Sequence, residues 1–437
     1  RSIAEMQDRL RDFAAKNPQR PWILARGFNE ALMAEGRMPD RYDLDQAVPD
    51  RPCYVIRTCA HIGVVNSVAL DLLPNLSPPP GGEVRLDALG NPSGVLTETA
   101  LGMVTRLIPA PDPAAYREMI LAAQDALLQQ GITSATDPAV MPDLLQVYKA
   151  LDTAGELKIR INAIPILVPD GGNTALPLPE PYHSDFLNVD TVKLFADGGL
   201  SGKTAALFAP YRGGKERGML RLADDFFLDL ARRAQAAGLR MATHAIGDAA
   251  IEQVLRIYAQ LDRHKAQALS HRIEHLGLPS KDHLQLMRDL NVSCVSQPIF
   301  LYELGPNFRK YLPDVYLQRV YPYRSVLDAG VRLAFSSDAP VVSDFNPLMG
   351  MRNAIERVDV QGELIAGKER IELAEALHAY THGAAQVIGA DHNNGDLSPG
   401  KWADFIVLDQ NPFQVKAAAL ADLTVMETWV GGVKISA

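Results

Sequence analysis

From about residue 114 onward, short apolar segments alternate with segments that have the amphipathic period of a helix. The apolar segments lie at 131–137, 159–167, 191–199, 238–248, 270–277, 292–298 and 331–340. Helical patterns separate several of them, for example DDFFLDLARRAQAAG and AIEQVLRIYAQLD. Short strands that alternate with helices are typical of β–α units around a parallel sheet. Six or more such units favour an α/β protein with a closed, TIM-like (β/α)8 barrel over one with an open sheet.

Two parts of the chain depart from this alternation. Residues 40–100 are rich in proline and glycine, with SPPPGGEVRLDALGNPSG at their centre, and predict an inserted loop or small β subdomain. After His392, the segments GDLSPGKWADFIVLDQNP and LTVMETWVGGVKI combine period-2 strands with turn residues. We therefore expect a barrel over 1–392, interrupted by the 40–100 segment, and a small β unit over 393–437.

Composition and charge narrow the class of protein. The 437 residues are 47% hydrophobic and 22% charged, as in an ordinary globular protein, and the net charge of −9 argues against nucleic acid or an anionic membrane as main partner. No apolar run approaches the roughly 18 residues of a membrane span, and no signal peptide is visible. Cys53, Cys59 and Cys294 form no Cys-x-x-Cys pair, so neither a disulfide framework nor a thiolate zinc site is expected. These features favour a cytoplasmic protein and do not argue against a small-molecule substrate.

Several apolar segments carry, at or near their end, a side chain that can bind a metal. Lys193 lies inside Val-Lys-Leu-Phe, where an unpaired ammonium group would be costly to bury. His244 ends RMATH, His275 ends RIEH and Asp338 ends LAFSSD. The C-terminal strand ends of a barrel meet on one face, and nitrogen and oxygen ligands of this kind suit Zn²⁺ or a similar divalent ion. These four positions therefore predict a metal site.

Each of these residues also has a purely structural interpretation. A histidine at a strand end can simply form a hydrogen bond, Asp338 before Ala-Pro can cap a turn, and Lys193 can extend to solvent. We favour the metal site, because the structural interpretations would all have to hold together at successive strand ends of one barrel.

The chain resembles the amidohydrolase superfamily in a series of motifs that occur in this order: VKLFADGGLSGKTA, HAIGDAA, HRIEH, SQP and SSDAP. Within the superfamily it is most similar to the amidohydrolase-3 branch, which includes N-substituted formamide deformylase-like proteins. The same resemblance is carried by WILARGF, LDQAVPDRPCYVIRTCAHIGVVNSVAL and NPSGVLTE near the start, and by GKWADFIVLDQNP near the end. It therefore covers nearly the whole chain.

The resemblance implies a metal-dependent hydrolase that cleaves an amide-type C–N bond of a small molecule. Lys193 matches a lysine that, in binuclear members of the superfamily, is carboxylated by CO₂ and bridges two metals. The resemblance also implies that His244 and His275 are metal ligands. Asp338 matches the aspartate that binds metal and accepts a proton from the attacking water. The expected cofactor is one or two divalent ions, with Zn²⁺ as first choice, and His275 and Asp338 are expected to take part in catalysis.

Other residues beside these motifs are candidates for contacting the substrate or orienting the ligands. His61, in CAHIGVVN, matches a family histidine of the pocket and is our candidate for contacting the substrate carbonyl, with a backbone-bonded loop histidine as the alternative. Asp248 and Arg272, next to the ligand motifs, are expected to orient the ligands. Ser201 and Lys203 follow in a glycine-rich turn and either line the pocket or belong to a solvated loop.

One part of the superfamily pattern has no counterpart here. The superfamily places His-x-His at the end of its first barrel strand, and the sequence contains no His-x-His. The chain begins with a helix of the kind that follows that strand, and the first half of the small β-sandwich has no counterpart either. The difference corresponds to roughly 50 to 90 residues. We therefore expect a barrel without its first strand and only the C-terminal half of the β-sandwich.

Two other functions remain open at this stage. A deaminase of a cyclic amidine or aromatic amine would use the same barrel, but such enzymes usually lack the strand lysine and carry a glutamate shortly after the strand-5 histidine. Lys193 is present, and HAIGD offers Asp248 instead, which favours amide hydrolysis. The second possibility is a metal-free, non-catalytic relative, supported only by the absent His-x-His. The family resemblance also favours a homodimer.

Overall fold

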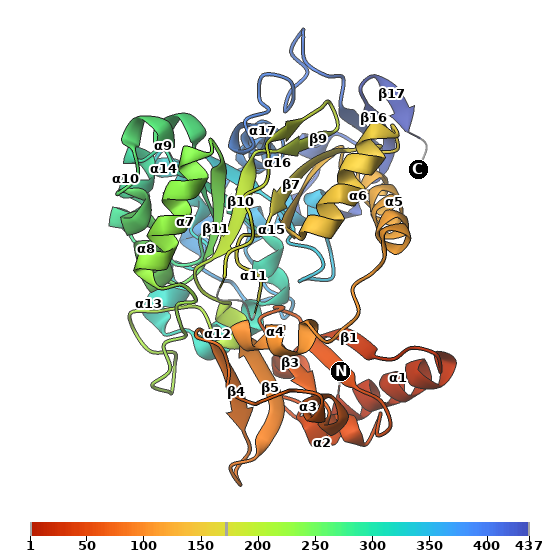
Figure 1. The fold of residues 1–437 in the computed structure, drawn as a ribbon. Coiled ribbons are helices and arrows are strands. Elements are labelled where there is room, and N and C mark those ends of the chain that lie inside the picture. Colours follow the sequence, from red (N-terminus) through yellow and green to blue (C-terminus); the bar gives the residue numbers. More distant parts are fainter. Residues whose placement is uncertain (1, 171–173, 436–437) are drawn as a thin grey trace.

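A computed structural model describes residues 2–170 and 174–435, and Figure 1 shows how they are arranged. The first hundred residues build a unit of their own at one end of the molecule, below the barrel in Figure 1. Its five-stranded sheet has the order β1-β2-β3-β5-β4, in which β1 and β2 are parallel and the other neighbours are antiparallel. The strands are β1 (Ile23–Phe28), β2 (Cys53–Arg57), β3 (Ile62–Val65), β4 (Gly82–Leu86) and β5 (Pro92–Glu98).

This N-terminal unit is larger than the sequence pattern predicted. Its sheet begins at β1, ahead of the expected 40–100 segment. The first helix, α1 (Ile3–Lys16), contacts β1 through a shared core that includes Leu10 and Ile23. The apolar side of this helix is buried within the N-terminal unit. The unit's other helices are α2 (Arg41–Asp45), α3 (Ser67–Asp71) and α4 (Gly102–Thr105).

The barrel region contains two sheets. One has the order β6-β7-β9-β8 and the other the order β10-β11-β12-β13-β14, with every neighbouring pair parallel except β8 and β9. A parallel bridge between Ile166 and Lys193 joins β7 to β10. The strands are β6 (Ser134–Val140), β7 (Arg160–Pro165), β8 (Tyr182–His183), β9 (Leu187–Val189), β10 (Thr191–Phe195), β11 (Arg240–Ala245), β12 (Arg272–His275), β13 (Ser293–Ser296) and β14 (Leu333–Phe335).

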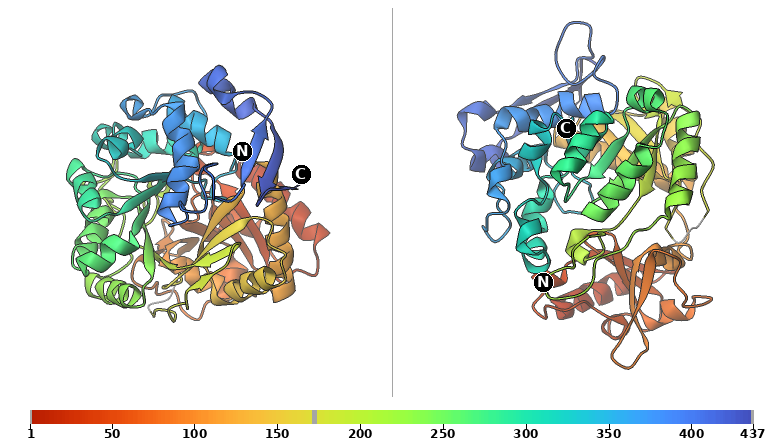
Figure 2. Two further views of the ribbon diagram at one scale, coloured as in Figure 1. Left: turned by 90° about the horizontal axis from the view of Figure 1, so that it is seen from above. Right: turned by 90° about the vertical axis from the view of Figure 1, so that its left-hand side faces the viewer.

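The expected (β/α)8 closure is not shown. Among the described residues, no strand pairing connects β14 back to β6, so the structure contains a parallel α/β arrangement without a demonstrated closed ring. Seen from above, helices lie around the outside of the strands (Figure 2, left). They are α5 (Pro113–Gln129), α6 (Pro142–Thr153), α7 (Asp224–Ala236), α8 (Asp248–Tyr258), α9 (Arg263–Leu269), α10 (Lys281–Asp289), α11 (Ile299–Glu303), α12 (Gly305–Tyr311), α13 (Asp314–Leu317), α14 (Tyr323–Asp328), α15 (Pro347–Glu356), α16 (Leu373–Tyr380) and α17 (His382–Val387).

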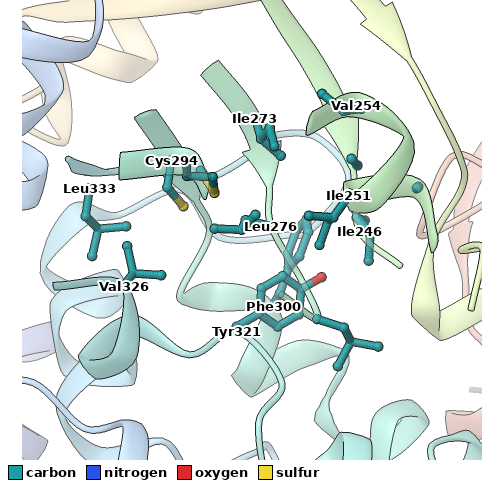
Figure 3. Close-up of a cluster of buried hydrophobic side chains, with 14 of the residues drawn as sticks. Ile246, Ile251, Val254, Ile273, Leu276, Cys294, Phe300, Tyr321, Val326 and Leu333 are labelled. Carbon is teal, nitrogen blue, oxygen red and sulfur yellow. The ribbon is translucent and has the colours of Figure 1, made fainter. Parts of the chain in front are cut away.

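Successive side chains of the barrel strands alternate between a face that packs on the helices and a face that carries buried polar groups. Ile273 of β12 and Cys294 of β13 belong to the apolar cluster that includes Val254 of α8 (Figure 3). Successive side chains of a strand point to opposite faces, so Arg272 and Glu274 lie on the face away from that cluster. Each helix layer therefore covers one strand face and leaves the other for buried polar groups.

The C-terminal segment forms an antiparallel sheet of three strands, β15 (Phe405–Leu408), β16 (Val425–Val430) and β17 (Val433–Ile435). It is attached to the barrel by buried polar contacts. Arg160 of β7 forms an ion pair with Asp404 at 2.6 Å, and the Thr428 hydroxyl donates to the Leu128 carbonyl at 2.9 Å. None of the described helices combines the length and apolar character that a membrane crossing would need.

Candidate metal and active site

A small cavity of about 20 Å³ lies where the N-terminal unit meets the C-terminal strand ends of the barrel. Its volume corresponds to about one water molecule. Polar lining comes from Cys59, His61, Ser201, His244, His275 and Asp338. Apolar lining includes Leu200, Ile246, Phe300, Leu304, Phe308, Tyr321 and Val341. The structure therefore brings together five of the predicted site residues from both units of the chain.

His244 is buried near the end of β11 and is held through one ring nitrogen. Its Nε2 lies 3.1 Å from the Gly198 carbonyl oxygen and 3.4 Å from a carboxylate oxygen of Asp197. Burial, followed by the nearby cationic forms of His275 and His61, lowers the pKa of His244 well below its usual value. A neutral imidazole whose Nε2 carries the proton has Nδ1 as its lone-pair donor, which is the form that ligates metals.

His275 is held in the complementary way at the end of β12. Its Nδ1 lies 2.7 Å from the side-chain oxygen of Gln297, so Nε2 is the atom left to act as a ligand. The His275 and His244 rings have centroids 4.4 Å apart. Burial lowers the pKa of His275, although the Asp338 carboxylate acts in the opposite direction.

The backbone is strained at the two strand ends that supply these groups. His275 has φ of 74° and Asp338 has φ of 58°, and few residues other than glycine adopt this left-handed region. At His275 the backbone turns, so the regular alternation of side chains between the two faces of β12 ends there. His275 therefore lines the cavity although it directly follows the buried Glu274. Such strain costs on the order of 1–3 kcal/mol per residue and is concentrated at functional sites.

Lys193 is buried in β10, with only 3% of its surface exposed. The interpretation that it extends to solvent is therefore wrong. Its ammonium nitrogen lies 4.7 Å from the centre of the Phe195 ring. Burial lowers the pKa of Lys193, and the carboxylates of Glu274 and Asp338 only partly counteract that effect. The neutral amine form of Lys193 is therefore favoured more strongly than it is for a lysine on the protein surface.

His61 enters the cavity from the turn between β2 and β3. Its Nδ1 lies 3.0 Å from a carboxylate oxygen of Glu98, and its ring centroid is 5.0 Å from that of His244. Its partner is thus a buried carboxylate, not the backbone of a loop. Burial disfavours the imidazolium, but the charge and hydrogen bond of Glu98 outweigh it and raise the pKa of His61 to about 9.

The remaining predicted residues occupy different surroundings. Ser201 lines the cavity and its hydroxyl accepts from Arg57 at 3.0 Å, whereas Lys203 is one-third exposed and pairs with Glu216 at 3.4 Å. Arg272 donates to Glu274 at 2.6 Å inside the barrel.

Asp248 lies at the start of α8 and accepts from the Phe208 N–H at 3.0 Å and the Tyr316 hydroxyl at 2.6 Å. These contacts anchor the loop at residue 208 and α13 and do not involve either histidine ligand.

Sequence reasoning missed three buried acidic groups around the site. Asp197 accepts from the backbone N–H groups of Ala206, Ile246 and Gly247, and burial raises its pKa to about 7 despite those bonds. Glu98 pairs with His61, and Glu274 lies beside Lys193. The sequence did indicate these groups, because each is an acidic residue within an otherwise apolar segment, in ADGG, LTE and RIEH. Their partners come from other strands, which the sequence does not specify.

The cavity is lined by donor types that divalent metals such as zinc accept. Two neutral imidazoles, each with one nitrogen anchored by a protein acceptor, share the cavity with the Asp338 carboxylate. Within the described ranges, no three His, Cys, Asp or Glu side chains are grouped closely enough to hold an ion. The structure therefore does not assemble the predicted ligands around one ion, and Lys193, the fourth of them, does not line the cavity.

A parallel α/β arrangement with imidazole and carboxylate groups at the strand ends is typical of enzymes of the β/α-barrel class. The chain belongs to the amidohydrolase family, whose model matches residues 1–435, which confirms the resemblance found in the motifs. N-substituted formamide deformylase of Arthrobacter pascens is 28% identical over 95% of this chain and 79% of its own length.

Two solved structures share the fold. An uncharacterized metal-dependent hydrolase of Pyrococcus horikoshii OT3 superposes with a TM-score of 0.74 and 26% identity, covering 95% of this chain and 82% of that one. A second one, from Pyrococcus furiosus, gives a TM-score of 0.69 and 28% identity, covering 94% of this chain and 82% of that one. The protein is therefore similar to hydrolases over almost its whole length.

Proposed function

We propose that the protein is a metal-dependent hydrolase that cleaves an amide-type C–N bond of a small molecule. The main support is the opposite anchoring of the two histidines. His244 is held through Nε2 and His275 through Nδ1, which leaves one nitrogen of each ring to act as a ligand, and both residues line the cavity together with Asp338. A metal-ligating histidine commonly has its other ring nitrogen held by a protein acceptor in this way, and this supports the proposal.

Lys193, His244, His275 and Asp338 would hold one or two divalent ions. Burial favours the neutral form of Lys193, and a neutral amine can add CO₂ to form a carbamate, which is an oxygen ligand. A bound ion would lower the pKa of a water and polarise the scissile carbonyl. Asp338 would accept the proton of the attacking water and pass it to the departing amine, while His61 would contact the carbonyl oxygen.

The cavity has a mixed lining. Apolar side chains such as Phe300 and Tyr321 lie beside His61, whose pKa is raised to about 9 by Glu98, and the described lining contains no Lys or Arg. Because a relative is an N-substituted formamide deformylase, a neutral N-substituted formamide is the first substrate to test.

The test combines metal content with product analysis. We expect protein purified without chelators to contain about one or two equivalents of zinc by plasma mass spectrometry, and to release formate from N-benzylformamide. Removal of the metal should abolish the release. Ammonia released from aromatic amines or cyclic amidines, without formate, would contradict amide hydrolysis and favour deamination. Absence of metal and of both activities would leave the non-catalytic interpretation.

Asp338→Asn should lower kcat by roughly 100- to 10,000-fold, the usual contribution of a general base. Asparagine tolerates the left-handed conformation found at this position, so the fold should be retained. Asp404→Asn, which alters a buried carboxylate in the tail junction, is the matched control and should keep wild-type kcat. Asp338→Asn activity within tenfold of wild type would contradict the assignment.

A further inference from the structure

The N-terminal unit is fixed on the barrel by a buried polar network. Arg57 is fully buried and donates to both carboxylate oxygens of Glu30, at 2.8 and 2.9 Å. The same guanidinium donates to the hydroxyl and the carbonyl of Ser201, at 3.0 and 2.9 Å. Beside it, the Thr58 hydroxyl donates to the Val341 carbonyl at 2.9 Å. These contacts hold the turn that carries His61 against two loops of the barrel.

Glu98 binds His61 twice. Its backbone N–H donates to the His61 carbonyl at 2.9 Å, and its carboxylate accepts from His61 Nδ1 at 3.0 Å. Arg221 Nη1 lies 3.4 Å from the same carboxylate oxygen. Glu98 is completely buried and has a left-handed φ of 50°, a conformation that costs free energy unless the surroundings enforce it.

The second oxygen of Glu98 packs against the loop that holds His244. Oε1 lies so close to Gly198 that a Cβ atom at that position would be 1.9 Å away, so a larger residue there would displace the Glu98 carboxylate. The carbonyl of this same Gly198 accepts from His244 Nε2. Glu98 therefore contacts His61 on one side and the holder of a metal-ligand candidate on the other.

A hydrogen bond from Nδ1 to Glu98 leaves Nε2 as the His61 atom available to the cavity. The bond also prevents rotation of the ring, which stays 5.0 Å from the His244 ring across the cavity. We propose that Glu98 is a positioning residue that holds His61 in the orientation in which it meets the substrate carbonyl. The N-terminal unit thereby completes the active site. This inference rests on the proposed hydrolase function.

A double-mutant cycle on metal-loaded enzyme with N-benzylformamide tests the proposal. If Glu98 acts through His61, Glu98→Gln should lower kcat by about 10- to 100-fold with a small change in KM, as loss of an orienting partner does. In a His61→Gln background the same substitution should then have no further effect. Losses that multiply in the double variant, or a Glu98→Gln kcat within twofold of wild type, would overturn the proposal.

A second measurement does not depend on turnover. Long-range ¹⁵N–¹H spectra of metal-free protein, labelled at histidine, report which ring nitrogen carries a proton, and His61→Gln identifies the His61 signal. Glu98→Gln should change the His61 nitrogen shifts, whereas Asp404→Asn should not. An unchanged His61 signal in Glu98→Gln would overturn the proposal. If wild type hydrolyses no amide but this signal changes, the proposed function fails while the positioning contact stands.

Discussion

Buried ionisable side chains surround the cavity, and the charge of each depends on a partner from another element. Burial favours neutral Glu98, yet the cationic His61 and Arg221 lower its pKa. Asp197 has only backbone donors and a nearby histidine, and burial raises its pKa to about 7. Two carboxylates of similar burial thus have opposite pKa shifts, because Glu98 pairs directly with His61 and Arg221 whereas the hydrogen bonds to Asp197 come from backbone N–H groups.

Lys193→Met should remove metal binding while preserving volume in the barrel. Methionine fills a similar space but has no amine to carboxylate, so the predicted oxygen ligand is lost. We expect metal content to fall at least severalfold, together with amide hydrolysis. Lys158→Ala, which removes an exposed lysine paired with Asp125 at 2.7 Å, should leave both unchanged. Wild-type metal content in Lys193→Met would show that the lysine is not a ligand.

Loops at the C-terminal strand ends are tied together by side chains at helix starts. Asp248, the first residue of α8, accepts from Phe208 N–H and the Tyr316 hydroxyl, and lies 3.3 Å from Arg319. The first residue of α8 therefore holds two segments that are distant in sequence, the loop at residue 208 and helix α13. Such a residue determines the shape of the site without contacting the predicted ligands.

Asp248→Ala should destabilise the protein by roughly 2–4 kcal/mol, because the buried Tyr316 hydroxyl and the partly buried Phe208 N–H lose their acceptor. In a Tyr316→Phe background the loss should be smaller, since one of those donors is already absent. Urea unfolding of the single and double variants measures this coupling. Asp229→Ala, at an exposed pair with Arg233, should change the free energy of unfolding by less than about 1 kcal/mol. Fully additive effects at 248 and 316 would contradict the contact.

The two units of the molecule share one site, so their attachment should matter for stability and for activity. Arg57 is the centre of this attachment, since it joins Glu30 of the N-terminal unit to Ser201 of the barrel loop. Removing one partner of a buried pair leaves the other charge without compensation.

Arg57→Ala should lower the free energy of unfolding by about 3–5 kcal/mol. It should also reduce kcat, because the turn with His61 and the loop with Ser201 lose their common anchor. Chemical unfolding and limited proteolysis between the units would measure the first effect, and formate release the second. Arg212→Ala, at an exposed pair with Asp314, is the control. Wild-type stability in Arg57→Ala would show that the units are held by other contacts.

Much of the barrel and of the predicted metal site follows from the sequence itself. Hydrophobic periodicity is a local property, so the alternation of strands and helices from residue 114 onward is legible without a structure. Chemical groups at the ends of apolar runs are equally local, and His244, His275 and Asp338 do line one cavity. The family motifs can also be recognised in the sequence alone, because each of them lies within one short segment.

The partners of those groups were decided only by the tertiary structure. The contact of His61 with Glu98 joins positions on two strands, and Asp197 reaches backbone donors of the loop and of the segment after β11. The packing of α1 on β1 also depends on which apolar surfaces meet in the folded chain. Burying a polar group requires a partner in space, and a linear pattern records the need for that partner without specifying its position.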